Sequence, residues 1–364
     1  LLFDEPLASL DPATGKSAIE LIDDIQKKTK KTILIIEHRL EDVLHCSVDR
    51  IIVVNEGKIA ADITPEQLLS SNLLVETGIR EPLYITALKY AGCTITPDMH
   101  PEHIDTLNID KCRENLKKWY EGVPEDNAAK TENTILEMKD VKFSYESGKE
   151  ILHGVSFKIN KGEMVSIVGR NGAGKSTISK LICGFYKPTE GQILFEGRDL
   201  INDTIKECAE KIGIVMQNPN QMISKTMVYD EVAFGLKIRG LSDSEIKERV
   251  YETLRICGLY GYRNWPISAL SFGQKKRVAI ASVVAMENKL VLLDEPTAGL
   301  DPAGRDDILE QIKFLHEKYN MTIILVSHSM EDVGKLAEKI IVMNDGHIEL
   351  QGKPKEVFKE IDTL

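Results

Sequence analysis

Several marks of specialised protein classes are missing from this sequence. No uncharged apolar run approaches the roughly 18 to 20 residues that a membrane-crossing helix needs. The six cysteines include no C-x-x-C pair, so neither a zinc site nor a redox motif is indicated. Positive charge is also in deficit: the net charge of −11 disfavours nucleic acid, whose phosphates an acidic surface repels, and we expect no nucleic-acid partner.

What is present is the composition of an ordinary globular protein. Apolar residues make up 42% of the 364 residues and charged residues 28%, which excludes disordered and fibrous classes. A chain of this length usually forms two or three domains. Apolar runs such as VLLD and TIILV indicate central strands of a parallel sheet that helices cover on both faces, so we expect an α/β fold.

An internal repeat organises the chain. The segment LLFDEPLASLDPATG, residues 1–15, returns with an offset of 290 residues as VLLDEPTAGLDPAGR, residues 291–305. Further on, TILIIEHRLEDV parallels TIILVSHSMEDV, so that His38 corresponds to His328 at the same offset. We infer two modules of one kind.

The two modules differ in extent. The second, residues 134–364, opens with two strands and continues in strand–helix alternation. The first, residues 1–78, begins within an apparent strand, so we expect it to be the C-terminal part of a module that has lost its front. Residues 79–133 contain four prolines and an acidic polar end, and we expect a partly structured connector that finishes in a flexible linker.

A glycine-rich phosphate loop is the clearest motif. GRNGAGKS, between an apolar strand and a helical segment, fits the pattern G-x-x-x-x-G-K-[ST]. Glycines let successive backbone N–H groups point at phosphate oxygens, and the helix N-terminus adds partial positive charge. We expect Lys175 to neutralise the β- and γ-phosphates of ATP and the Ser176 hydroxyl to bind Mg²⁺. The residues expected to contact the nucleotide here are Gly169, Arg170, Asn171, Gly172, Ala173, Gly174, Lys175, Ser176 and Thr177.

A pair of acids ends the apolar strand LVLLDE, where a parallel sheet presents its functional groups. Asp294 suits a water-mediated contact with Mg²⁺, and Glu295 can act as the general base on the attacking water. Two adjacent acids at a strand end are usually only part of a solvated loop. Their repetition at Asp4 and Glu5, together with the phosphate loop, favours the catalytic interpretation.

Three further kinds of side chain are weaker candidates. His328 and its counterpart His38 each lie 34 residues after the first acid of their module, which favours a shared task at the γ-phosphate or the attacking water, although such a histidine is more often structural. Gln217 follows another apolar strand, where its amide could contact Mg²⁺ and the attacking water, but a lone loop glutamine is weak evidence. Tyr145 could stack on a purine base, although an aromatic residue in a strand is more often core.

The segment LSFGQ, ahead of a helical stretch, resembles the signature motif of ATP-binding-cassette ATPases. With the phosphate loop, the glutamine, the acid pair and the histidine in the same order, the resemblance covers residues 134–364 and residues 1–78. Phe272 departs from the usual L-S-G-G-Q. Ser271 and Gly273, which match the residues that the family uses on the γ-phosphate of the partner module's ATP, are kept, and Gln274 is also expected to contact that nucleotide.

The resemblance implies a P-loop NTPase fold with a parallel-sheet core, an antiparallel β subdomain and a helical subdomain, in two tandem modules of which the first is incomplete. It also implies that two modules pair head to tail, each ATP lying between one module's phosphate loop and the other's signature. Glu5 and His38 would then serve the second composite site.

Two softer likenesses concern the subfamily. The stretches QNPNQMISKTMVYDEVAFGL and IEHRLEDV resemble energy-coupling-factor ATPases, the latter their tandem form. This implies Mg²⁺-dependent ATP hydrolysis that drives uptake of a vitamin or a metal ion, from a peripheral position on the cytoplasmic face of the cell membrane. The implied partners are an integral membrane coupling subunit and a substrate-binding membrane component.

Other functions stay open. A translation-factor type of tandem cassette ATPase would carry a long charged helical hairpin between its modules, which residues 79–133 fit poorly. A chromosome-maintenance ATPase would insert a coiled coil between the phosphate loop and the signature, but Lys175 and Ser271 are only 96 residues apart. The chain could also be a truncated product that binds ATP without turnover.

Overall fold

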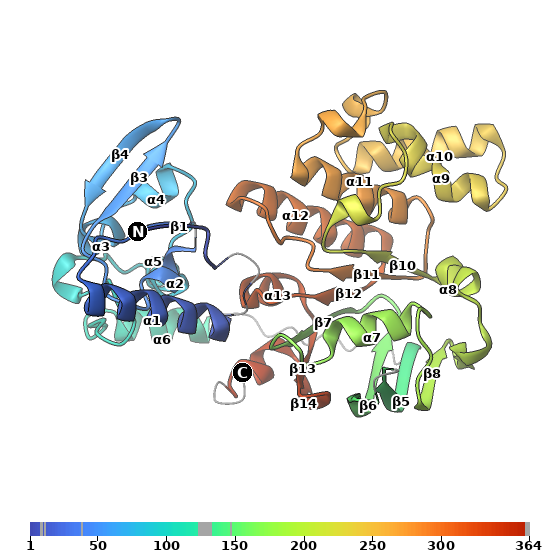
Figure 1. Cartoon of the computed structure of the whole chain (residues 1–364), viewed down its shortest axis with the longest axis horizontal. Helices are drawn as coiled ribbons and strands as arrows, with labels where there is room; N and C mark the ends of the chain where they lie inside the picture. Colours follow the sequence, from blue (N-terminus) through green and yellow to red (C-terminus); the bar gives the residue numbers. More distant parts are fainter. Residues whose placement is uncertain (8–9, 11, 38, 123–132, 146–147, 361–364) are drawn as a thin grey trace. The chain divides into compact units, whose positions relative to one another are not determined.

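The computed structural model, shown in Figure 1, comprises two compact units, each with its own hydrophobic core. The first unit is residues 1–130 with 301–303, and the second is residues 131–300 with 304–364. Within the described ranges, no helix combines the length and apolar character needed to cross a membrane. The structure describes residues 1–7, 10, 12–37, 39–122, 133–145 and 148–360.

The second unit is built on a six-stranded sheet in the order β10-β11-β12-β7-β13-β14, in which only β13 and β14 pair antiparallel. Alternate strand residues face opposite layers: Leu292 packs in one core with Ile178, and Val291 packs in another with Ile312. This two-sided burial confirms the α/β fold predicted from the apolar runs. The strands are β7 (Met164–Gly169), β10 (Ile212–Val215), β11 (Leu290–Asp294), β12 (Thr322–Val326), β13 (Lys339–Asn344) and β14 (His347–Gly352).

Two further subdomains complete the second unit, and Figure 1 shows them at opposite ends of it. One is an antiparallel sheet in the order β6-β5-β8-β9, formed by β5 (Thr134–Ser144), β6 (Glu150–Asn160), β8 (Glu190–Phe195) and β9 (Arg198–Asp199). The other is a helical group with a core of its own, formed by α9 (Val228–Ile238), α10 (Asp243–Ile256) and α11 (Phe272–Val284). The remaining helices are α7 (Lys175–Ile182), α8 (Ile205–Lys211), α12 (Pro302–Tyr319), α13 (Met330–Leu336) and α14 (Pro354–Val357).

The first unit contains two small strand pairs, one long helix and several short helices. β1 (Leu2–Asp4) and β2 (Leu34–Ile36) pair parallel, and β3 (Ile51–Asn55) and β4 (Lys58–Ile63) pair antiparallel. The helices are α1 (Pro12–Thr29), α2 (Leu40–Val43), α3 (Pro65–Leu69), α4 (Leu73–Glu76), α5 (Leu83–Tyr90) and α6 (Arg113–Glu121).

The expected connector shares a core with the first module. Ile85 and Leu88 of α5 are buried together with Leu68 of α3. The Leu83 N–H, at the start of α5, donates to the carboxylate of Glu41 at 2.9 Å. The boundary placed after residue 78 therefore runs through one folded unit, because apolar side chains of the short helices bury themselves against the preceding segment. The stretch expected to be a flexible linker, EDNAAKTEN (residues 125–133), lies outside the described residues except for Asn133.

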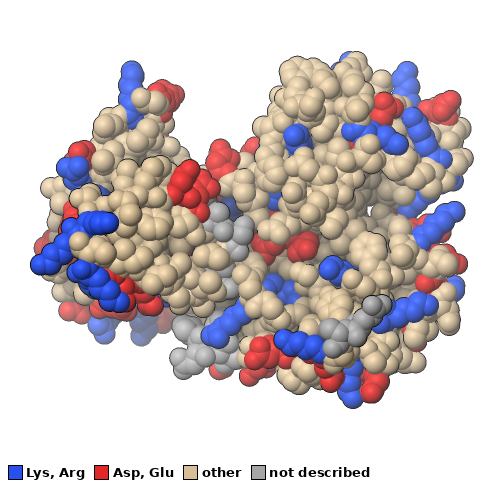
Figure 2. Space-filling model, in the orientation of Figure 1, with Lys and Arg blue, Asp and Glu red and all other residues tan. Residues whose placement is uncertain are grey.

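Charge is mixed on the surface of the second unit. On the face shown in Figure 2, the described Lys and Arg side chains are interspersed with Asp and Glu side chains.

Candidate nucleotide site

Four parallel strands carry predicted side chains to one edge of the central sheet. β7 leads into the phosphate loop and β11 ends at Asp294, while the segments that follow β10 and β12 carry Gln217 and His328. Because these four strands are mutually parallel, their carboxyl ends meet at the same edge. Gln217 is exposed there, two residues beyond the end of β10.

The phosphate loop curls because its three glycines, Gly169, Gly172 and Gly174, adopt conformations that other residues avoid. Gly169 has a φ of 150° and Gly174 a φ of 101°. A Cβ on Gly174 would lie 2.7 Å from Leu152 Cδ2, and one on Gly169 would collide with the Met343 carbonyl oxygen. Only glycine therefore gives the loop this path into the N-terminus of α7, where backbone N–H groups and the helix dipole favour an anion.

Lys175 connects this loop with the acid pair electrostatically. The side chain is buried, and its ammonium group donates to the carbonyl oxygens of Gly169 at 2.7 Å and Arg170 at 3.0 Å. Burial raises the pKa values of Asp294 and Glu295. The positive charge of Lys175 opposes this rise without cancelling it. The cation expected to neutralise the phosphates thus acts on the loop and on both acids.

Tyr145 lies beside the start of α7. Its hydroxyl group is 3.3 Å from Thr177 Oγ1, and its ring makes edge contacts with Phe143 and Tyr186 at centroid distances of 4.9 and 5.5 Å. The half-buried ring also packs against the core, as an ordinary strand aromatic does. Stacking of Tyr145 on a nucleotide base stays a prediction. It requires the ring to lie next to the phosphate-loop helix, and the ring lies there. Ser176, on the same helix, is exposed.

Burial raises the pKa values of both acids at the end of β11. For Asp294 the positive charges of Lys175, Lys180 and Lys276 oppose this rise. For Glu295, burial and then the neighbouring charge of Asp294 raise the pKa to about 7. A carboxyl group that titrates near neutrality can take a proton from water at working pH, as a general base must.

Glu295 occupies a strained turn facing the histidine. Its φ is 48°, which a residue with a side chain seldom adopts, and its N–H is held by the Val326 carbonyl oxygen at 2.9 Å. His328 Nε2 lies 3.4 Å from Glu295 Oε1. Backbone strain of this kind concentrates at functional sites. The structure also brings together Glu295 and His328, which were predicted from separate parts of the sequence.

The same turn occurs in the first unit. Glu5 has a φ of 44°, and its N–H donates to the Ile36 carbonyl oxygen at 2.9 Å. β1 also pairs with β2 in the register in which β11 pairs with β12, allowing for the repeat offset. Glu5 is exposed, whereas Glu295 is largely buried. His38 lies outside the described residues.

The signature residues form a separate group at the start of α11. Ser271 Oγ accepts from the Gln274 N–H at 3.2 Å, and Gln274 Oε1 accepts from the Ser271 N–H at 2.9 Å, which together make a capping box. Gly273 keeps this first turn free of bulk. Phe272, the departure from the usual motif, packs over Gly299, whose Cβ position lies 3.3 Å from the ring.

One buried cation near the site was not anticipated. Lys276 of α11 is 2% exposed, and its ammonium donates to the carbonyl oxygens of Glu295 at 3.0 Å and Pro296 at 2.9 Å. Burial lowers its pKa to about 8 against the opposing charges of Glu295 and Asp294. The sequence signal for it was helical spacing: Lys276 lies on the same face of its helix as Ala279 and Ile280, which face the core.

Comparison with known proteins agrees with this geometry. A family model described as ABC transporter matches residues 152–298, and one described as ATP-binding cassette cobalt transporter matches residues 71–143. A putative ABC transporter ATP-binding protein of Clostridium perfringens is 58% identical over 346 residues, 95% of this chain and 61% of the relative. One of Vibrio vulnificus is 48% identical over 358 residues, 98% of this chain and 62% of the relative. The chain thus spans somewhat over three-fifths of these relatives.

Solved structures show the same fold. CbiO1 from Clostridium perfringens, described as part of the ABC transporter complex cbiONQ, superposes with a TM-score of 0.60 at 39% identity, covering 64% of this chain and 93% of that one. A dimeric ATP-binding cassette in a post-hydrolysis state with ADP and Pi gives a TM-score of 0.55 at 31% identity, covering 60% of this chain and 99% of that one. This chain belongs to the ATP-binding-cassette family of transporter ATPases.

Proposed function

We propose that this protein binds and hydrolyses ATP to energise a membrane importer. The observation that carries the proposal is the arrangement at the end of β11. Glu295, with a pKa raised to about 7, lies 3.4 Å from His328 and within the electrostatic reach of Lys175 in the phosphate loop. A base, its histidine partner and a phosphate-binding cation on one sheet edge are the parts that hydrolysis of a phosphoanhydride needs.

The phosphate loop holds the nucleotide in this proposal. Its glycines leave the backbone N–H groups open toward the phosphates, and Lys175 supplies the positive charge. Tyr145 stacks on the base beside α7. Glu295 takes a proton from the attacking water, and His328 orients the water or contacts the γ-phosphate.

The chain also offers a donor set that fits Mg²⁺. The exposed Ser176 hydroxyl, the Asp294 carboxylate and the Gln217 amide supply only oxygen ligands, which this hard cation prefers, and two of them come from the sheet edge. These residues would hold Mg²⁺, which would supply positive charge against the charge that develops on the phosphate oxygens. Burial raises the pKa of Asp294, and the positive charge of Lys175 opposes this rise.

We further propose that two cassettes pair head to tail and share two ATP sites. The repeated turn at Glu5 supports a tandem protein in which the first unit is the C-terminal part of another cassette and, with His38, serves the second site. The capped Ser271 turn supports a signature that contacts ATP held by the partner cassette. The dimeric relative with bound ADP and Pi is organised as a pair.

The relatives support the proposed importer role. The match to a cobalt-transporter cassette model and the likeness to a component of the cbiONQ complex favour a metal ion over a vitamin as cargo. We propose an integral membrane coupling subunit and a substrate-binding membrane component as partners, which place the protein peripherally on the cytoplasmic face of the membrane. Tagged protein from detergent-solubilised membranes should retain an integral membrane protein, and recovery without any such partner contradicts the importer role.

The catalytic proposal is tested by Glu295→Gln. We expect ATP binding to persist, because the phosphate contacts remain, and turnover to fall by about 10² to 10⁴-fold, because the base is lost. The measurement is calorimetric ATP affinity together with steady-state phosphate release. Lys175→Ala is the matched variant, for which affinity itself should fall. Wild-type turnover in Glu295→Gln would remove Glu295 from the proposed role.

A further inference from the structure

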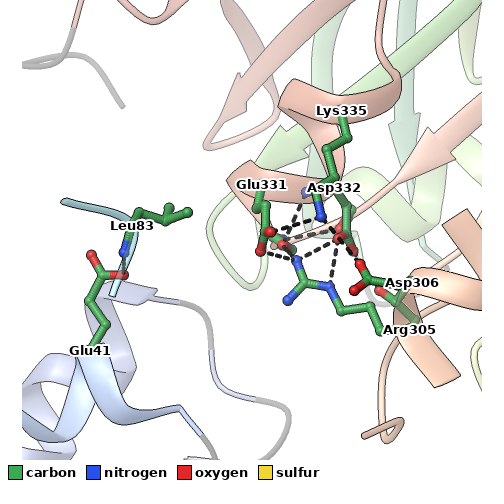
Figure 3. A network of polar contacts seen from close by, with 10 residues as sticks. Glu41, Leu83, Arg305, Asp306, Glu331, Asp332 and Lys335 are labelled. Atoms are coloured by element: carbon green, nitrogen blue, oxygen red, sulfur yellow. Dashed lines mark hydrogen bonds and ion pairs between the residues drawn. The ribbon is translucent and has the colours of Figure 1, made fainter. Parts of the chain in front are cut away.

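A buried ion cluster joins the segment after Glu295 to the segment after His328, and Figure 3 shows it from close by. Arg305 of α12 donates from Nε to Asp332 Oδ1 of α13 at 2.7 Å. The other carboxylate oxygen, Oδ2, accepts from Thr297 Oγ1 at 2.6 Å. Asp332 is 1% exposed, so both of its oxygens are committed inside the protein.

The cluster is adjacent to the catalytic pair along the chain. Thr297 follows Glu295 by one intervening residue, and Ser329, the neighbour of His328, accepts from Arg305 Nη2 at 2.6 Å. On its outer side, Lys335 pairs with Glu331 at 3.0 Å and with Asp306 at 3.2 Å, both within the network of Figure 3. The inner contacts thus fasten the loops that present the base and the histidine.

The first unit makes the equivalent connection with a different residue. Arg39, at the position of Ser329, lies 2.6 Å from the carboxylate of Asp42, which corresponds to Asp332. Its guanidinium also donates to the Leu7 carbonyl oxygen at 3.0 Å, in the loop that follows Glu5. Gly15 stands where the second unit has Arg305.

We infer that Arg305 and Asp332 form a positioning clamp that sets His328 against Glu295. An isolated buried ion pair is weak evidence for any role, since its desolvation offsets much of its attraction. In both units the loop after the glutamate is joined to the histidine segment, and an arginine holds the aspartate of that segment. In the second unit the joining contact is Thr297 to Asp332, which Arg305 of α12 holds. In the first unit Arg39 makes both contacts, one to the Leu7 carbonyl oxygen and one to Asp42. What is kept is the connection between the loops, not the residue that makes it.

The inference rests on the proposed ATP hydrolysis and is tested with the intact protein. In Arg305→Ala we expect kcat for ATP to fall about 10²-fold, as small displacements of reacting groups do, with KM within about twofold, because the phosphate loop is untouched. Adding Ser329→Arg to Arg305→Ala places an arginine at the position that Arg39 occupies in the first unit. The double variant should regain at least about tenfold in kcat, since the guanidinium again reaches Asp332.

A second readout does not depend on turnover. The ring Cε1–H signal of His328, assigned with His328→Gln, should shift in Arg305→Ala and return toward its original position in the double variant. Lys335→Ala, which removes an exposed cation from the rim of the same network, should leave kcat and the signal unchanged. Thermal melting of each variant shows that it is folded.

The outcomes separate the two claims. Wild-type kcat and an unmoved His328 signal in Arg305→Ala overturn the clamp, and so does a folded double variant that recovers neither. If the wild-type protein does not hydrolyse ATP, the proposed function fails, and the His328 signal alone decides whether the clamp positions the ring.

Discussion

Glu295 is a carboxyl group whose surroundings disfavour its charge. Burial and the charge of Asp294 raise its pKa from the ordinary 4.5 to about 7. Lys276 shows the complementary effect, because burial lowers its pKa to about 8 while its ammonium grips the turn that carries Glu295. Such opposed shifts around one turn are typical of sites that move protons near neutral pH.

This shift predicts how stability depends on pH. Between pH 4.5 and 7 the folded state binds more protons at Glu295 than the unfolded state does, so the free energy of unfolding falls as the pH rises through this window. Glu295→Gln removes this dependence. At pH 8 the variant should be more stable than the wild type by roughly 3 kcal/mol, and at pH 4 the difference should vanish.

The measurement is urea unfolding followed by Trp265 fluorescence in a Trp119→Phe background, so that only the second unit is observed. Glu5→Gln is the matched control, because it changes the same turn in the first unit, where the carboxylate is exposed. Equal midpoints for Glu295→Gln and the wild type at pH 8 contradict the raised pKa.

At the scale of elements, α11 begins with a cap that has two possible uses. The Ser271–Gln274 capping box stabilises the helix, and the same hydroxyl is the proposed contact for the partner cassette's ATP. The chain contains a second such box at the start of α10, where Ser242 and Glu245 make the same reciprocal bonds. The two helices allow structure and function to be separated.

Ser271→Ala and Ser242→Ala should each lower the free energy of unfolding by about 1 kcal/mol, since each removes one cap. Only Ser271→Ala should also reduce ATP turnover. Ser271→Asp keeps the cap and should retain stability, but its charge faces phosphate and should lower turnover further. Turnover losses of equal size in Ser271→Ala and Ser242→Ala would show that the signature acts only through helix stability.

The local sequence pattern predicted those parts of the site that are formed by residues adjacent in the sequence. The glycines of the phosphate loop and the acids after β11 were recognisable because strand, turn and helix follow one another in sequence. The partners of Arg305 were not, because an arginine in a helix is normally exposed and nothing local announces a buried aspartate 27 residues later. The packing of the connector was not predictable for a similar reason. Its prolines indicated a segment with only partial structure, and nothing local shows that Ile85 and Leu88 pack against the preceding module.

At the scale of the whole molecule, the two units have different relations to the nucleotide. Each has its own core, and the phosphate loop, Tyr145 and the acid pair with His328 all belong to the second. The first unit carries Glu5 in the repeated turn but contributes no phosphate loop among its described residues. We therefore expect ATP to stabilise the second unit directly and to leave the stability of the first unit unchanged.

Calorimetric melting of the intact protein should show two transitions, and the non-hydrolysable analogue AMP-PNP with Mg²⁺ should raise only the one that belongs to the second unit. At 100 times its Kd a ligand contributes about 2.7 kcal/mol, which for a unit of this size corresponds to roughly 5–11 °C. Lys175→Ala should abolish the shift at the same concentration, while Glu295→Gln should preserve it. The Trp119 and Trp265 signals assign the transitions, because each unit holds one of them. A single transition, or an equal shift of both, would mean that the units unfold together and that the nucleotide stabilises the molecule as one body.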